Sequence, residues 1–226
     1  MASLLSVLDL LFPSRCAGCD GWGRAPLCVA CESGVRWITD DACMKCGRPS
    51  DAPVPRCRDC RDRNLAFDRA RAASSYEGPA RDALKSFKLR GERRTARELA
   101  RWMVPPALSL GGADVIAWVP STRRSEAERG FNPAEELARR LSRSLAVPVT
   151  RLLRKTRETA DQAGLSGAAR RENLRDAFAA VTTRIPARVL LVDDVMTTGT
   201  TVNECAAALK AKGAKRVTVV TFARAP

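Results

Sequence analysis

The sequence contains no histidine, so the general base of any reaction must be Asp, Glu, Lys or water. No stretch approaches the roughly 20 apolar residues that cross a bilayer, and we expect no membrane span. The Gly-x-x-x-x-Gly-Lys-Ser/Thr and Gly-x-Gly-x-x-Gly nucleotide motifs are missing. Aromatic residues make up only 5%, which weakens any case for binding single-stranded nucleic acid by base stacking. The remaining composition is typical of a globular protein.

The apolar start of the chain lacks the pattern of a secretory signal peptide. Residues 1–13 carry no basic n-region, Asp9 interrupts the apolar run, and no small-residue cleavage site precedes Arg15. We therefore expect a short amphipathic helix that ends at Pro13 and packs on its own protein, and a cytoplasmic location.

Eight of the nine cysteines form four Cys-x-x-Cys pairs: Cys16/Cys19, Cys28/Cys31, Cys43/Cys46 and Cys57/Cys60. Each pair directs two sulfurs toward one point, and two pairs complete a tetrahedral thiolate site for zinc. The four pairs predict two structural zinc ions, with Cys205 left out of both. The spacing leaves open which pairs share an ion, because consecutive pairs would give tandem ribbons and interleaved pairs a cross-brace.

Other uses of these cysteines fit the sequence less well. Disulfides are typical of secreted chains, and a thioredoxin-like protein has one Cys-x-x-Cys motif beside a βαβ unit. An iron–sulfur cluster remains an alternative, although it does not explain two equivalent ribbons. So short a segment buries little core, and we expect metal binding to supply most of its folding energy.

Charge is distributed unevenly along the chain. Residues 1–62 hold eight basic and eight acidic side chains, whereas residues 63–226 hold 31 basic and 17 acidic ones. Four thiolates with one Zn²⁺ carry a net charge of about −2, so metal binding makes the first segment acidic. We divide the chain into a cysteine-rich module, residues 1–62, and a basic domain, residues 63–226, with a separate core. The basic excess indicates a polyphosphate or nucleic-acid partner, although a solvated arginine-rich surface has the same composition.

A phosphate-binding pattern lies in residues 188–201. The apolar run of residues 189–192 predicts a parallel strand buried on both faces, and Asp193 and Asp194 follow at its carboxyl end. A turn then leads to a predicted helix of residues 202–212, and it contains Thr197, Thr198, Gly199, Thr200 and Thr201. A helix N-terminus with threonine hydroxyls suits a phosphate. The carboxylates suit ribose hydroxyls, directly or through Mg²⁺.

Two other interpretations of this pattern are weaker. A response-regulator receiver also has a strand that ends in two aspartates, but it needs roughly a whole domain afterwards, and only 32 residues follow Asp194. A plain strand–turn–helix with capping threonines explains the glycine and the threonines, but not two adjacent charges.

The motifs resemble one known family in order along almost the whole chain. Residues 189–201 resemble the phosphoribosyl-diphosphate motif of type I phosphoribosyltransferases. The cysteine knuckle of residues 43–47, and residues 87–91, 119–120 and 129–132, resemble segments of the ComF-like competence family, also described as amidophosphoribosyltransferase-like. The resemblance implies an α/β fold: a type I phosphoribosyltransferase domain with a central parallel sheet, preceded by a small cysteine-rich zinc ribbon module. Pro133 departs from the family pattern, but it fits the first turn of a predicted helix over residues 134–145.

The resemblance also implies the remaining site residues. A predicted strand over residues 114–119 ends at Pro120, where the next loop resembles the diphosphate-binding loop and offers Arg123 and Arg124. Guanidinium groups there match the geometry of phosphate oxygens. Residues 151–175 resemble the hood that covers the diphosphate and excludes water, and its candidate residues are Arg154, Gln162 and Arg170.

The implied chemistry is displacement at ribose C1, with Mg²⁺ on the leaving diphosphate. Asp193 and Asp194 are the catalytic candidates. Lys88 and Arg90 are weaker candidates for the site, because a basic pair at a helix end is usually solvated.

Three functions remain open. The family resemblance implies a protein that binds phosphoribosyl diphosphate and acts in natural competence, in DNA uptake or the handling of incoming single-stranded DNA, with competence or recombination proteins as partners. The alternative is an active phosphoribosyltransferase of nucleotide metabolism with an unidentified acceptor. A protein–protein adaptor that acts through the ribbon is the third. An enzyme should release diphosphate only when its acceptor is present. A DNA-handling protein should bind single strands in a salt-sensitive way, and an adaptor should do neither.

Overall fold

The computed structural model describes residues 15–22, 26–90, 93–156 and 177–225. The expected leader helix of residues 1–13 therefore lies outside the described residues, as does most of the expected hood. In chain order, the elements are α2 (Val29–Ser33), α3 (Arg58–Arg61), β1 (Arg69–Ser75), α4 (Gly78–Arg90), α5 (Arg93–Ser109), β2 (Val115–Trp118), α6 (Arg123–Arg129), α7 (Pro133–Leu145), β3 (Leu153–Lys155), β4 (Phe178–Ala180), β5 (Arg188–Met196), α9 (Thr200–Lys210) and β6 (Arg216–Arg224). Among the helices so described, none has the length and apolarity to cross a membrane.

Four parallel strands form the central sheet in the order β1-β6-β5-β2. The strand predicted over residues 114–119 is β2, and the one predicted over residues 189–192 is β5. β5 is longer than predicted, because its pairing with β6 continues to Met196 opposite Arg224. A separate antiparallel pair joins β3 to β4. The expected α/β fold with a central parallel sheet is confirmed.

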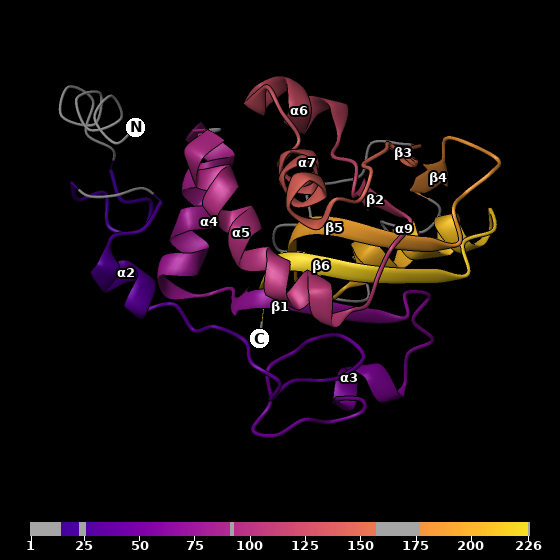
Figure 1. The fold of residues 1–226 in the computed structure, drawn as a ribbon, viewed down its shortest axis with the longest axis horizontal. Helices are drawn as coiled ribbons and strands as arrows, with labels where there is room; N and C mark the ends of the chain where they lie inside the picture. Colours follow the sequence, from indigo (N-terminus) through magenta and orange to yellow (C-terminus); the bar gives the residue numbers. More distant parts are fainter. Residues whose placement is uncertain (1–14, 23–25, 91–92, 157–176, 226) are drawn as a thin grey trace.

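Helices cover both faces of this sheet (Figure 1). The helices α4, α5 and α7 pack on the face that carries Leu190 and Val192. Helix α9 packs on the other face, which carries Val189 and Leu191. Because successive side chains of a strand point to opposite faces, the continuous apolar run of β5 contributes to both cores. Helix α9 begins and ends two residues earlier than predicted.

Pro133 lies in the first turn of α7, as predicted, and the helix begins there, one residue before the predicted range, with Asn132 as its N-cap. The Asn132 side-chain oxygen accepts a hydrogen bond from the Glu135 N–H at 3.2 Å, and its amide nitrogen donates to the Val119 carbonyl at 3.1 Å. Proline is favoured in the first turn because no intrahelical partner is needed there. The cap thus fixes the start of α7 against the end of β2, beside the loop that leads to the candidate site.

The cysteine-rich segment does not have a core of its own. In its first half, Cys16, Leu27 and Val35 are buried in the layer of α4, α5 and α7. In its second half, Cys43 and Cys60 are buried with side chains of α9 and the sheet. The prediction of separate cores is therefore wrong, because ribbons this short cannot enclose their own apolar side chains. The domain boundary at residue 62 stays a prediction.

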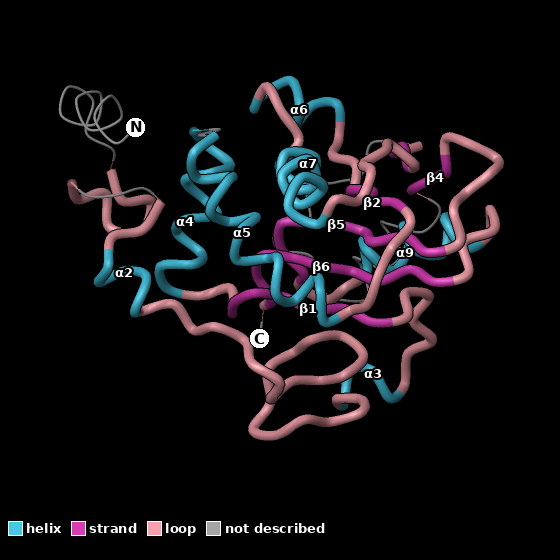
Figure 2. Tube along the Cα trace, in the orientation of Figure 1, coloured by secondary structure: helices cyan, strands magenta, loops and turns pink. Residues whose placement is uncertain are grey.

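The chain between the two ribbons covers the outer edge of β1. The Ile38 N–H donates to the Ala73 carbonyl at 3.0 Å, and the Ser75 N–H donates to the Arg36 carbonyl at 2.9 Å. Figure 2 shows this connection as loop rather than strand. An uncovered edge strand offers its backbone to other chains, so these bonds remove one surface for unwanted pairing.

Candidate functional site

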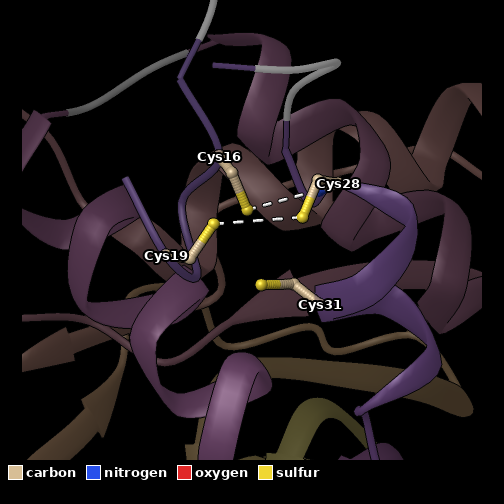
Figure 3. Close-up of side chains that lie close together, drawn as sticks. All are labelled: Cys16, Cys19, Cys28 and Cys31. Atoms are coloured by element: carbon tan, nitrogen blue, oxygen red, sulfur yellow. Dashed lines mark hydrogen bonds between the residues drawn. The ribbon is translucent and has the colours of Figure 1, made fainter. Parts of the chain in front are cut away.

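The eight paired cysteines form two clusters of four in consecutive order. The first cluster contains Cys16, Cys19, Cys28 and Cys31 (Figure 3), and the second cluster contains Cys43, Cys46, Cys57 and Cys60. Within each cluster, the four sulfurs lie within 4.8 Å of one another. The ribbons are therefore in tandem, which the spacing of the cysteines had left open. Cys205 belongs to neither cluster and is buried in α9.

The distances between the sulfurs fit zinc. Four sulfurs at about 2.3 Å from one tetrahedral ion lie about 3.8 Å apart. The sulfurs of Cys19 and Cys28 are 3.9 Å apart in the first cluster, and those of Cys46 and Cys57 are 3.7 Å apart in the second. Each cluster therefore has the ligand set and the spacing of a structural zinc site.

In each cluster, one thiol has a lowered pKa and ionises more readily than a free cysteine. Burial by itself raises the pKa of Cys16, but backbone N–H groups, including that of Cys28 at 3.2 Å, outweigh burial and lower the pKa to about 6. Burial likewise raises the pKa of Cys43, and N–H groups lower it to about 7. For Cys31 and Cys60, burial raises the pKa, so these thiols stay protonated without a cation. Zinc binding at neutral pH therefore releases protons.

A pocket of about 950 Å³ opens at the carboxyl ends of β2 and β5, where open α/β sheets bind their ligands. Its walls come from α4, α6, the start of α7, the β3–β4 pair and the start of α9. The charged lining residues are the cations Lys88, Arg124, Arg129 and Lys155 and the carboxylates Glu128, Asp193 and Asp194. The uncharged lining residues are Val119, Pro120, Ser121, Thr122, Ser125, Asn132, Pro133, Ala134, Phe178 and Thr201.

Asp193 and Asp194 lie inside β5 and not after it. Strand alternation directs them to opposite faces of the sheet. Asp194 is only 7% exposed, and it forms an ion pair with Lys88 in the last turn of α4. Asp193 lies toward α9, where burial and then the charge of Asp193 raise the pKa of the Cys205 thiol. The two carboxylates therefore have different environments although they are adjacent in the sequence.

The charges around the two aspartates differ: a cation faces Asp194, whereas a carboxylate neighbours Asp193. Burial lowers the pKa of Lys88, but the charges of Asp194 and Asp193 outweigh burial and raise it, so Lys88 stays charged at neutral pH. Burial, followed by the negative charge of Asp194, raises the pKa of Asp193 well above its usual value. Asp194 thus has a resident counter-charge, whereas the ionised form of Asp193 is unfavourable until a ligand supplies donors or a cation.

The turn between β5 and α9, residues 197–201, is called the phosphate loop below. Gly199 has a φ of +73°, which glycine adopts at little cost, and a Cβ there would lie 2.6 Å from Cε of Met196. The hydroxyl oxygens of Thr198 and Thr200 lie 2.9 Å apart. The loop is therefore tightly packed, with Thr201 at the pocket wall.

The structure brings six of the candidate residues to the pocket: Lys88, Pro120, Arg124, Asp193, Asp194 and Thr201. Others lie outside its lining: Thr197, Thr198, Gly199 and Thr200 in the adjoining loop, Arg123 with an exposed side chain on α6, and Arg154 with an exposed side chain on β3. Gln162 and Arg170 lie outside the described residues.

Sequence reasoning undervalued Lys88 and missed Arg129, Lys155 and Phe178. Lys88 was expected to be solvated, yet it lines the pocket and pairs with Asp194. Its one sequence signal is its place in residues 87–91, a segment that resembles the family. Arg129 likewise lies in residues 129–132, which resemble the family, whereas Lys155 and Phe178 follow no recognisable motif and only the fold brings them to the pocket.

Comparison with known proteins gives the same two-part organisation. Residues 7–61 match the double zinc ribbon domain, and residues 127–226 match the phosphoribosyl transferase domain. Competence protein F of Haemophilus influenzae is 30% identical over 95% of this chain and 98% of its own length. The DNA utilization protein YhgH of Escherichia coli K12 is 32% identical over 90% of this chain and 91% of its own length.

Among solved structures, the glutamine phosphoribosylpyrophosphate amidotransferase from B. subtilis is 27% identical over 56% of this chain, with a TM-score of 0.37. This chain spans only 26% of that enzyme. The match to the relatives, in contrast, extends over nearly their full length. With its tandem four-cysteine clusters followed by a parallel α/β sheet, the chain belongs to the ComF-like competence family, in which a double zinc ribbon precedes a phosphoribosyltransferase domain.

Proposed function

We propose that the pocket at the ends of β2 and β5 binds phosphoribosyl diphosphate, and that the protein acts in the cytoplasm in DNA uptake or the handling of incoming single-stranded DNA. The observation that carries the proposal is the placement of Asp193, Asp194 and the start of α9 around one pocket with four cations. The ribose hydroxyls donate to the carboxylates. The 5′-phosphate is bound by the N-terminus of α9 and the phosphate loop.

The diphosphate end of the ligand is assigned to the opposite wall. Arg124 and Arg129 of α6 line it, beside the loop of residues 120–122 that follows β2. The Arg124 guanidinium forms an exposed ion pair with Glu128 at 2.8 Å, one turn further along α6. Because guanidinium groups bind phosphate oxygens in a fixed fork geometry, these arginines suit a diphosphate better than a neutral ligand.

The site fits Mg²⁺ at one aspartate better than at both. Mg²⁺ prefers oxygen ligands and keeps several waters, and a carboxylate of this pocket together with a bound diphosphate supplies such oxygens. Lys88 already neutralises Asp194, so a divalent ion there would meet an ammonium group. Asp193 is thus the residue that would hold Mg²⁺, which would supply positive charge to the diphosphate.

The competence assignment is supported by the names of the relatives and by charge. Relatives of nearly the same length are named competence protein F and DNA utilization protein. The net charge of residues 63–226 is strongly positive, and basic surfaces bind nucleic acid through phosphate contacts.

One observation favours the alternative, an active phosphoribosyltransferase with an unidentified acceptor. The chain has no histidine, but the raised pKa of Asp193 makes it a stronger base than an ordinary aspartate. In such a reaction, the acceptor forms a bond to ribose C1, the bond from C1 to diphosphate breaks, and Asp193 takes the acceptor's proton. Acceptor-dependent release of diphosphate would establish this alternative.

Calorimetry with three ligands tests the binding proposal. Phosphoribosyl diphosphate with Mg²⁺, ribose 5-phosphate and inorganic phosphate are titrated into the wild type and into the double variant Asp193→Ala/Asp194→Ala. The variant should lose affinity for the two ribose ligands and keep its affinity for phosphate, because the phosphate loop is intact. Equal affinity of both proteins for phosphoribosyl diphosphate would defeat the site assignment. Thermal melts confirm that the variant is folded.

A further inference from the structure

Arg224, at the end of β6, connects the second cluster to the phosphate loop. Its side chain is almost completely buried, with the residue 3% exposed. Nη1 donates to the carbonyls of Met196, at 3.1 Å, and Thr197. Nη2 lies 4.0 Å from the sulfur of Cys46. One guanidinium therefore contacts both a zinc ligand and the backbone at the start of the loop.

A guanidinium buried this deeply needs both a counter-charge and hydrogen-bond acceptors. A zinc ion with four thiolates carries a net charge of about −2, and Arg224 is placed to balance part of it. The carbonyls of Met196, Thr197 and Ala225 accept from Nη1, whereas Nε is buried without a hydrogen-bond partner among the described residues. When zinc leaves, nothing holds the four cysteines of the second cluster together, so the Cys46 sulfur beside Arg224 is no longer fixed in place.

The chain that leaves the second cluster adds two further contacts. The Arg63 side chain donates to the Thr198 carbonyl at 2.7 Å, and the Ala66 N–H donates to the Asn203 side chain, in the first turns of α9, at 2.7 Å. Arg224 and Arg63 thus each bind a backbone carbonyl of the phosphate loop, and Ala66 binds the first turns of α9, which follow the loop. In the described part of the first ribbon, we find no such bond; its link to the site side of the domain is the pair of Arg90 with Asp20, at 3.0 Å.

We propose that the second cluster, with Arg224 as a positioning residue, holds the phosphate loop in its binding conformation. Zinc at the second cluster therefore controls how well the loop is ordered, and zinc at the first cluster does not. The consequence for phosphate affinity rests on the proposed function. The consequence for loop order is independent of the proposed function, so an experiment can reject either one without rejecting the other.

Hydrogen exchange of the backbone amides of residues 196–203 measures loop order directly. Arg224→Met is compared with Arg216→Met, a matched control on the same strand. Arg216 donates to the carbonyl of Leu110, away from the loop. We expect exchange at least about tenfold faster in Arg224→Met and unchanged in Arg216→Met, since hydrogen bonds from charged groups are the stronger ones. Unchanged exchange in a folded Arg224→Met protein would overturn the proposal.

Two further variants separate the clusters. Cys57→Ser changes a half-buried ligand of the second cluster, and Cys19→Ser changes an exposed ligand of the first. Elemental analysis should show about one zinc ion lost in each, and only Cys57→Ser should speed exchange in the loop. Equal effects of the two substitutions would refute the proposal. If Arg224→Met does not fold, Arg224→Lys takes its place, because lysine keeps the positive charge but lacks the two-pronged guanidinium. Faster amide exchange at residues 196–203 is then required of Arg224→Lys.

Calorimetry with phosphoribosyl diphosphate completes the test. If the wild type binds it, Arg224→Met should bind about tenfold more weakly, by the same hydrogen-bond argument. If the wild type does not bind it, the proposed function fails, and the exchange comparison still decides whether the second cluster orders the loop.

Discussion

Lys88 and Asp194 form an ion pair that joins the last turn of α4 to the site end of β5. The pair places a permanent positive charge inside the candidate pocket, beside Asp193. Removal of the lysine leaves a nearly buried carboxylate without its counter-charge, which is the costly way to break such a pair.

We predict that Lys88→Met lowers the free energy of unfolding by about 2–4 kcal/mol, measured by urea titration. The control is Lys85→Met, an exposed lysine of the same helix, which should change stability by less than about 0.5 kcal/mol. Adding Asp194→Asn to Lys88→Met should recover part of the loss, because it removes the unpaired charge. Equal losses in both single variants would contradict the pairing.

Asp193→Asn should stabilise the ligand-free protein at neutral pH. The pKa of Asp193 is raised by burial and by Asp194, so its folded-state value exceeds its unfolded value. Such a group contributes stability at low pH, and that stability is lost as pH rises through the folded pKa. The melting temperature of the variant should therefore exceed that of the wild type by about 2 °C or more at pH 7.5, and the difference should shrink toward pH 4. A constant difference across this range would count against the assignment.

Gly199→Ala should destabilise the protein more than Gly130→Ala. The two glycines have similar φ values, +73° and +77°, so each alanine carries a conformational cost of about 1–2 kcal/mol. An added Cβ has open space at Gly130 but contacts Met196 at Gly199. Urea midpoints of the two variants measure the difference. Equal midpoints would show that Met196 moves aside without cost.

Purified protein should contain about two zinc ions, and Cys16→Ser should remove one. Because Cys16 is buried in the layer of α4, α5 and α7, this substitution should lower the melting temperature of the whole protein and not of the ribbon alone. Elemental analysis and a melt followed by both near-UV and far-UV circular dichroism provide the measurement. Absence of zinc, or an unchanged main transition in the metal-depleted variant, would oppose this prediction.

Because basic side chains bind the phosphates of single-stranded DNA, this binding should depend on the basic domain, residues 63–226, more than on the ribbon. Arg123→Glu with Arg129→Glu changes two exposed arginines of α6, and Arg58→Glu with Arg61→Glu changes two exposed arginines of α3 by the same total charge. The α6 pair should weaken binding more and reduce the salt slope. Fluorescence anisotropy at several salt concentrations makes the comparison. A larger effect at α3 would identify the ribbon as the binding surface.

The parts of the fold that sequence predicts best are those with local patterns. The apolar run before Asp193 predicts a buried parallel strand, and the Cys-x-x-Cys spacing predicts metal ligands, because backbone geometry over a few residues decides both. What sequence cannot supply is contact between distant segments. Nothing local distinguishes Lys88 from a solvated lysine, or shows that Leu27 and Cys43 are buried in different layers of one domain. For the same reason, only the structure shows Arg224 beside Cys46.

The order of the strands in the sheet has a consequence for synthesis on the ribosome. β1 is made early, yet its neighbour in the sheet is β6, with Arg69 opposite Thr218. Until residue 224 has emerged, β1 has no neighbouring strand in the sheet, and the core that buries Leu27 and Val35 still lacks Val220 and Phe222. Such a delay is typical of contacts between residues far apart in the sequence, which form slowly and expose apolar surface to aggregation. A nascent chain loaded early with zinc would hold its ribbons compact during this wait, so zinc supply should affect the yield of folded protein as well as its stability.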